Sequence, residues 1–223
     1  MLVETIYRNL RNQLLLRFGL DLVKVADRKT FLQPIRRVMS ETSVLLNGCE
    51  AYFLMSCAAA TANVEGDIAE VGVFRGGSAK LIAEAKGDRE LHLFDSFTGL
   101  PELTEKDSAS LFQPGQFLAM EDEVRRYLSS FANVFIHKGW FPGTARSVGS
   151  RKFSFVHLDV DLFEPTRDAL EFFYPRLSRG AVLVSHDYNY AAGVRRAFDE
   201  FFLDKPENVL EQPGGTQCFI VKQ

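Results

Sequence analysis

The sequence has few cysteines, no long apolar run and no cluster of positive charge. Its three cysteines, Cys49, Cys57 and Cys218, are odd in number and lie in apolar contexts. They predict buried free thiols in a reducing compartment and argue against a disulfide framework. No Cys-x-x-Cys pair or His/Cys array is present, which argues against structural zinc. The longest apolar stretch, residues 51–62, is too short to cross a bilayer.

The net charge and the N-terminal residues further limit the class of protein. The net charge of −3 over 223 residues, without a stripe of lysine or arginine, argues against a nucleic-acid partner. Glu4 and Arg8 interrupt the apolar run at the start, so a secretory signal is not expected. We therefore predict a cytoplasmic protein without a membrane partner, and its hydrophobic content of 46% is ample for a full core.

Two enzyme classes are excluded by missing motifs. A nicotinamide-dependent oxidoreductase would carry Gly-x-Gly-x-x-Gly and, in its short-chain form, Tyr-x-x-x-Lys. The glycine motif is absent, and none of the six tyrosines has a lysine four residues on. The Gly-x-Ser-x-Gly motif of serine hydrolases is absent as well.

From Gly66 onward, short apolar runs alternate with helical patterns. The runs predict strands at residues 68–74, 90–95, 134–137, 155–158 and 181–184, and the helical periods predict helices at 76–85, 121–131, 166–177 and 194–202. Residues 210 and 218–221 are expected to form terminal strands that pair antiparallel. This alternation is typical of an α/β fold with a Rossmann-like, mostly parallel sheet covered on both faces.

Residues 1–64 are expected to be helices packed on or over a core domain of residues 65–223. A helix is predicted at residues 3–16, and the apolar residues on one face of it are Leu2, Ile6, Leu10 and Leu14. Pro34 predicts a break in a mixed segment up to about residue 38, and residues 40–44 are expected to open a long helix that runs to about residue 60 with Ser43 as its cap. These N-terminal helices are the surface through which the chain could form a homo-oligomer.

Residues 98–119 have no clear period and are rich in polar residues, glycine and proline. A loop this long inside a compact domain is usually a lid or a binding segment. We predict a lid at about residues 98–125, with Phe112 and Phe117 as apolar contacts to a substrate.

Acidic side chains follow two of the predicted strands. Asp159 and Asp161 come directly after the run 155–158, and they alternate, so both side chains point the same way. His186 and Asp187 follow the next strand at the same sheet edge, where open α/β sheets bind ligands. Like charges at that range repel unless a cation or a proton intervenes. The alternative is that these residues are solvated acids or helix caps.

The turn after the first strand, Glu70-Val-Gly-Val-Phe-Arg-Gly-Gly-Ser78, offers glycines for close backbone approach and a helix N-terminus for anions. Asp95 ends the second strand 23 residues after Gly72, where a carboxylate binds ribose hydroxyls in doubly wound folds. Gly139-Trp140 could stack an adenine, although packing explains Trp140 equally well, and a tight turn explains the glycines. These features predict a site for S-adenosylmethionine. The residues expected to bind it are Glu70, Gly72, Arg75, Gly76, Ser78, Asp95, Ser96, Gly139, Trp140 and Asp159.

Three segments carry a resemblance to a known family. They are Glu65–Ser78, Phe94-Asp-Ser-Phe-Thr-Gly-Leu-Pro101 and His157–Leu170, with further matches at 174–188 and 193–199. In these motifs, in order over residues 40–205, the chain resembles the TylF-type macrocin O-methyltransferases. The resemblance implies a class I methyltransferase fold, with seven strands, the last antiparallel, and a helical lid. It also implies S-adenosylmethionine as donor, a divalent metal that is usually magnesium, and a hydroxyl acceptor, often a sugar on a natural product.

The resemblance also implies roles for the acidic residues. Carried over from the family, Asp159 and Asp187 are metal ligands and Asp161 is the general base. His186 stands where the family commonly has aspartate; a neutral imidazole can ligate a divalent ion but favours softer metals than magnesium. The metal set is then Asp159, His186 and Asp187. The expected function is an S-adenosylmethionine-dependent O-methyltransferase of natural product biosynthesis. The alternative is a non-catalytic binding or scaffold protein that keeps the fold.

Overall fold

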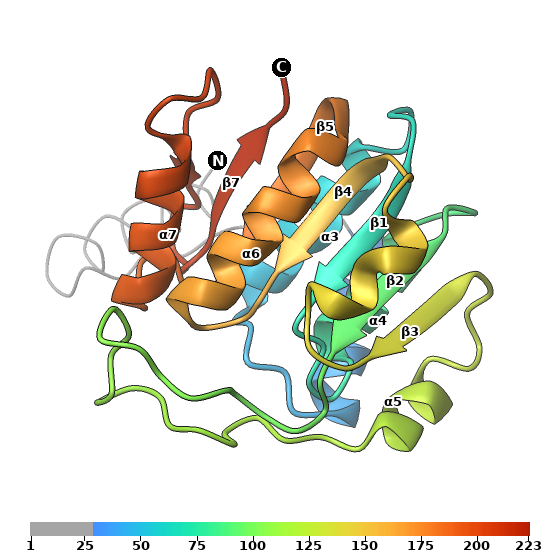
Figure 1. Ribbon diagram of the computed structural model, residues 1–223. Helices are drawn as coiled ribbons and strands as arrows, with labels where there is room; N and C mark the ends of the chain where they lie inside the picture. Colours follow the sequence, from blue (N-terminus) through green and yellow to red (C-terminus); the bar gives the residue numbers. More distant parts are fainter. Residues whose placement is uncertain (1–28) are drawn as a thin grey trace, which may run out of the picture.

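The computed structural model describes residues 29–223, and its centre is one seven-stranded sheet (Figure 1). The strand order is β3-β2-β1-β4-β5-β7-β6. The strands are β1 (Asp67–Val71), β2 (Leu91–Asp95), β3 (Val134–Lys138), β4 (Phe153–Leu158), β5 (Leu177–Ser185), β6 (Leu210–Glu211) and β7 (Cys218–Val221). β1 to β5 are parallel, and β7 pairs antiparallel with both β5 and β6. The predicted α/β class and the antiparallel terminal pair are confirmed.

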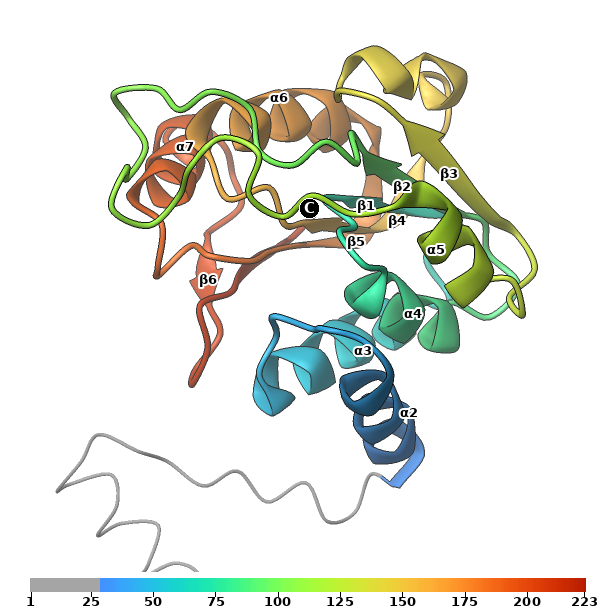
Figure 2. The same ribbon diagram turned by 90° about the horizontal axis from the view of Figure 1, so that it is seen from below.

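Helices cover both faces of the sheet. Figure 2 shows α2 (Lys29–Glu41), α3 (Gly48–Ala60) and α4 (Gly77–Ala85) on one side, and α6 (Phe163–Phe173) and α7 (Ala192–Phe202) on the other. One core forms on each face because the central strands are apolar on both faces, as parallel strands must be. The six residues of β4 are all buried. The two cores hold the carboxyl ends of β1, β2, β4 and β5 in place at one edge.

The N-terminal helices begin and end elsewhere than predicted. α2 continues through Pro34, so the predicted break is wrong, and the chain between α2 and α3 is not helical. Asn47, not Ser43, caps α3: its side chain accepts from the N–H of Cys49 and of Glu50, while Glu50 accepts from the N–H of Asn47. This reciprocal capping box satisfies backbone donors that a serine four residues earlier cannot reach.

Other helices and strands also begin or end at residues different from those predicted. The predicted helix 166–177 is α6 followed by a 3₁₀ turn, η2 (Tyr174–Arg176), because Pro175 has no N–H to continue an α-helix. β5 therefore starts at Leu177, earlier than the predicted residue 181. The helix predicted at 121–131 is shorter, α5 (Glu121–Tyr127), and a second 3₁₀ turn, η1 (Gly143–Val148), precedes β4.

Some expectations concern residues 1–28. The helix predicted at 3–16, with its face of Leu2, Ile6, Leu10 and Leu14, lies outside the described residues. Within residues 29–223, no helix is long and apolar enough to span a lipid bilayer. The three cysteines are free, but only Cys218 is fully buried, since Cys49 and Cys57 are partly exposed.

Candidate active site

A cavity of about 540 Å³ opens at the carboxyl ends of the parallel strands. It is lined by the carboxyl ends of β1 and β2, by the residues that follow β4 and β5, by the segment before α3 and by the long loop after β2. All but three of the predicted site residues line it: Gly72, Ser78, Asp95, Ser96, Gly139, Trp140, Asp159, Asp161, His186 and Asp187. The prediction that the strand-end residues meet at one edge of the sheet agrees with this arrangement.

His186 lies between two of the acids that line the cavity. Its Nδ1 is 3.2 Å from Asp159 Oδ1 and 3.1 Å from Asp187 Oδ1. Asp161 and Asp187 both have left-handed backbone, with φ of 64° and 61°, which is uncommon for a residue with a side chain. Such backbone persists where the surroundings enforce it, and it clusters at functional sites. The strand ends therefore aim these carboxylates at one another.

The acids perturb one another's ionisation. Burial and the negative charges of Asp159 and Asp187 hold the pKa of Asp161 well above its usual range. Burial opposes the charged form of His186, but Asp159, Asp187 and Glu50 outweigh it and raise the imidazole pKa. The protonated imidazole then places a positive charge among the carboxylates. Its proton offsets the repulsion between their negative charges.

Two carboxylates and an imidazole also suit a divalent ion. One ligand atom from each of Asp159, His186 and Asp187 lies within 4.8 Å of the others. The distances of 3.1 and 3.2 Å from Nδ1 to the carboxylate oxygens match neighbouring ligands of one ion with bonds near 2.1 Å. Nδ1 ligates only when it carries no proton. A nitrogen donor fits manganese, iron or zinc better than magnesium, which prefers oxygen.

Gly72 and Asp95 shape the loop between β1 and α4. Gly72 has φ of +85°, and a Cβ there would lie 1.8 Å from the carbonyl oxygen of Asp159. Asp95 Oδ2 accepts from the N–H of Val73 at 2.7 Å and of Phe74 at 2.8 Å. Its Oδ1 accepts from the N–H of Phe97 at 2.6 Å. Asp95 thus orders the glycine loop and still faces the cavity, where a carboxylate oxygen has capacity for a further donor.

Glu70 does not reach the cavity wall. It is fully buried, and its Oε1 lies 2.8 Å from Nδ1 of the equally buried His157. Burial raises the pKa of Glu70, although His157 opposes that shift. Its other oxygen, Oε2, and His157 Nε2 have no hydrogen-bond partner among the described residues. Contact between Glu70 and a cofactor stays a prediction.

Arg75 and Gly76 also lie off the cavity wall. Arg75 is exposed and donates through Nη1 to Ser43 Oγ at 3.2 Å. Gly76 precedes α4 with φ of 79°, and a Cβ there would meet Val124 and Tyr127 of the neighbouring α5. The turn at Gly76 serves helix packing, which was the alternative interpretation of these glycines.

The loop after β2 forms one wall. Residues 98–119 contain no helix or strand and pass the carboxyl ends of the strands (Figure 1). Phe112 and Phe117 line the cavity, and their contact with a substrate stays a prediction. Asp107 Oδ1 accepts from the N–H of Phe163 at 2.7 Å, which ties the loop to the start of α6. Trp140 lines the cavity and is 53% exposed, so ordinary core packing does not account for it.

Sequence reasoning missed Glu50 and Thr216. Glu50 lines the cavity from α3, and its Oε1 accepts from Thr216 N at 2.7 Å, so the two residues join the N-terminal helices to the segment before β7. The capping-box spacing Asn47–Glu50 was a signal for the helix start. No local pattern signals a hydrogen bond between residues 166 positions apart.

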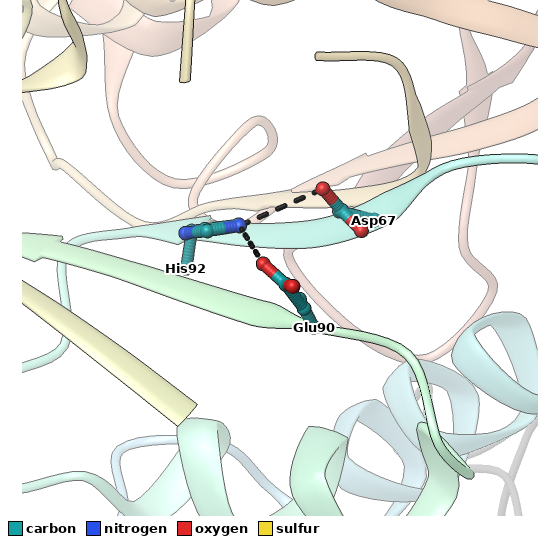
Figure 3. A group of neighbouring side chains, drawn as sticks. All are labelled: Asp67, Glu90 and His92. Carbon is teal, nitrogen blue, oxygen red and sulfur yellow. Dashed lines mark ion pairs between the residues drawn. The ribbon is translucent and has the colours of Figure 1, made fainter. Parts of the chain in front are cut away.

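A second group of acids and histidine lies at the opposite edge of the sheet, at the amino ends of β1 and β2. Figure 3 shows His92 Nε2 facing Asp67 and Glu90, at 3.6 and 3.4 Å. Arg151 Nη1 is 2.6 Å from an oxygen of each of these carboxylates and supplies the positive charge between them. Burial and Arg151 lower the pKa of His92, which keeps it neutral. This cluster is an ion-pair network joining β1, β2 and the start of β4.

Comparison with solved structures supports the fold. The O-methyltransferase NovP superposes with a TM-score of 0.72 at 24% identity, over 82% of this chain and 84% of that chain. An O-methyltransferase from Bacillus cereus in complex with SAH superposes with a TM-score of 0.59 at 12% identity, over 96% of this chain and 97% of that one. At these identities the likeness shows a shared class I methyltransferase fold.

Curated relatives share sequence over the core. The chain is 32% identical over 154 residues to demethyldecarbamoylnovobiocin O-methyltransferase of Streptomyces niveus, covering 62% of this chain and 59% of that protein. It is 31% identical over 155 residues to mycinamicin III 3''-O-methyltransferase of Micromonospora griseorubida, covering 62% and 61%. The chain thus spans about six tenths of the length of these relatives. The macrocin-O-methyltransferase (TylF) family model matches residues 54–213, from α3 past β6, and the chain belongs to this family.

Proposed function

We propose that this protein is an S-adenosylmethionine-dependent O-methyltransferase that acts on a hydroxyl of a small molecule, a sugar or another natural product, with help from a divalent metal. The observation that carries the proposal is the cluster of Asp159, Asp161, His186 and Asp187 inside a cavity bordered by the glycine loop. The names of the relatives support it, since they describe O-methyltransferases of demethyldecarbamoylnovobiocin, of a rhamnosyl-tetracenomycin C and of mycinamicin III. A structural neighbour in complex with SAH supports the donor.

The donor would lie along the glycine loop. The backbone at Gly72 approaches Asp159 closely, and both residues line the cavity. Asp95 faces the same space and could accept from ribose hydroxyls, and the exposed ring of Trp140 could stack the adenine. We propose that residues 98–125 close over the bound molecules and exclude water.

Methyl transfer to an alcohol requires removal of its proton, because an alcohol ionises far above neutral pH. A divalent ion held by Asp159, His186 and Asp187 would lower the pKa of an acceptor hydroxyl bound to it. Asp161 would accept the hydroxyl proton as the oxygen attacks the methyl carbon. The carbon–sulfur bond breaks as the new carbon–oxygen bond forms, and S-adenosylhomocysteine leaves with the electron pair on sulfur.

The alternative function, a binding or scaffold protein without chemistry, has one observation in its favour. His186 sits between Asp159 and Asp187 and neutralises charge that an ion would otherwise neutralise. The cavity and the inward-facing Asp161 favour catalysis, because neither is needed to stabilise the sheet. A screen of hydroxylated acceptors with radiolabelled donor distinguishes the two functions.

Donor binding should depend on Asp95. Calorimetry is expected to show binding of S-adenosylhomocysteine that Asp95→Asn weakens by about 1–3 kcal/mol, because an amide leaves backbone donors of the loop unpaired. The exposed Asp88→Asn serves as control and should bind as the wild type does. Binding of NADH together with no response to S-adenosylhomocysteine would rule out the proposed donor.

Metal binding should depend on Asp187 and on the proton of His186. Asp187→Ala is expected to lose both Mn²⁺ affinity and turnover, since two remaining ligands cannot set the geometry. Because ligation requires loss of the Nδ1 proton, Mn²⁺ affinity should fall as pH falls, and it should fall less steeply in His186→Asp. His186→Asp should also shift preference toward Mg²⁺. Calorimetry with both ions checks these results, and turnover that survives a strong chelator would contradict metal assistance.

A further inference from the structure

A buried glutamate from the N-terminal helices faces the histidine of the acid cluster. We propose that Glu50 is a positioning residue that keeps the Nε2 proton on His186 and so presents Nδ1 to Asp159 and Asp187. The inference rests on the proposed function, because it assigns Glu50 to the same site. It explains how this chain accommodates histidine among acidic ligands.

The position of Glu50 is firmly set. It is 2% exposed, and all of its oxygen contacts come from groups that donate. Oε1 accepts from Thr216 N at 2.7 Å and from Thr216 Oγ1 at 3.1 Å, and Oε2 accepts from Asn47 N at 2.8 Å. Three hydrogen-bond donors therefore hold both oxygens of the Glu50 carboxylate in place.

The two nitrogens of His186 face different carboxylates. Nδ1 lies between Asp159 and Asp187, whereas Nε2 lies 3.6 Å from Glu50 Oε2. Nε2 is buried and has no hydrogen-bond partner among the described residues, at a spacing slightly beyond a hydrogen bond. A buried ring nitrogen aimed at a fixed carboxylate is most stable carrying a proton.

This arrangement matches a general requirement for histidine ligands. An imidazole that binds a metal through one nitrogen donates its other N–H to a carboxylate or carbonyl, which sets the tautomer and ring orientation. Glu50 faces Nε2, the nitrogen that would donate its N–H. Asp159 and Asp187 face Nδ1, the nitrogen that would bind the metal. Without the charge of Glu50, the proton would favour Nδ1, beside two carboxylates, and Nδ1 could no longer ligate.

Glu50→Gln tests the role of Glu50, because it keeps the size of the side chain and replaces one carboxylate oxygen, an acceptor, by an NH₂ group, a donor. With its amide oxygen toward Thr216 N, its NH₂ group would face the N–H of Asn47 and Nε2 of His186. A donor that faces Nε2 disfavours a proton on that nitrogen, so the proton that remains on the ring lies on Nδ1. We expect Mn²⁺ affinity, measured by calorimetry, to fall by about 10–100-fold. Glu207→Gln is the matched control, since Glu207 is 4% exposed and bonded to Lys222 and Tyr174, and its Mn²⁺ affinity should equal that of the wild type.

A second variant separates positioning from general damage to the fold. In His186→Asp there is no ring to orient, so adding Glu50→Gln should cause no further loss of Mn²⁺ affinity. The ring itself is followed by ¹⁵N NMR of metal-free protein. Nε2 of His186 should carry a proton in the wild type and lose it in Glu50→Gln.

The outcomes separate this inference from the proposed function. If wild type binds Mn²⁺ and Glu50→Gln binds it equally well, the role of Glu50 is overturned while metal assistance stands. An equal loss in the His186→Asp background would also overturn it. If wild type binds neither Mn²⁺ nor Mg²⁺, metal assistance fails and the NMR result decides: a proton that moves from Nε2 in Glu50→Gln supports positioning, and an unchanged ring overturns it.

Discussion

Asp161→Asn is expected to lower turnover by about 10²–10⁴-fold, the usual contribution of a general base. Asparagine has nearly the same shape but cannot accept the hydroxyl proton. Donor and metal affinities should stay close to wild type, because Asp161 is not among the three residues whose ligand atoms converge. Single-turnover kinetics with labelled donor, together with calorimetry on the same preparation, measure both effects.

Asp122→Asn is a suitable control for this substitution, since Asp122 is exposed on α5 and outside the cavity. It should keep full turnover. If Asp161→Asn also keeps wild-type turnover, another group takes the proton and the assignment of Asp161 as base is wrong. If Asp161→Asn instead loses Mn²⁺ binding, Asp161 is a ligand and not the base.

The parts of the fold that sequence predicted are those set by short-range patterns. Apolar runs of four to six residues, such as 155–158, marked buried parallel strands because both faces of such strands are covered. Once the strands were placed, the acids behind them had to meet at one edge. Asp159, Asp161, His186 and Asp187 do meet there, and their chemical roles stay predictions.

The parts that sequence could not predict depend on contacts between distant segments. Asp95 was assigned to ribose from its position, but its carboxylate also bonds the loop after β1, which only the packed strands reveal. Glu70 was assigned to the cofactor, yet the buried His157 pairs with it beneath the cavity. Glu50 reaches Thr216 across most of the chain. Local periodicity carries no information on such pairs.

Helix ends were predicted least well, because competing caps are close in sequence. Ser43 and Asn47 are both good N-cap residues. The glutamate three residues after Asn47 decides in favour of Asn47, since it completes the capping box. Pro34 was interpreted as a break, but tertiary packing of α2 against α3 and α4 keeps the helix continuous.

Gly72→Ala is expected to destabilise the protein by roughly 3–5 kcal/mol, from overpacking and backbone strain together. Gly72 donates its N–H to Phe94 O at 2.9 Å, and Asp159 donates its N–H to Val71 O at 2.9 Å, so the ends of β1, β2 and β4 are held together. An added Cβ would lie 1.8 Å from the Asp159 carbonyl oxygen, and backbone on both sides leaves it no room.

Urea unfolding followed by circular dichroism measures this loss, and Gly87→Ala is its matched control. Gly87 also has positive φ, +63°, but a Cβ there would meet nothing within 4 Å. Its substitution should therefore cost only the backbone strain, about 1 kcal/mol. Any Gly72→Ala protein that folds should also bind S-adenosylhomocysteine more weakly, because moving the Asp159 carbonyl displaces the carboxylate beside it. If the two variants are equally stable, the chain after β1 does not lie close enough to the Asp159 carbonyl to exclude a side chain at residue 72.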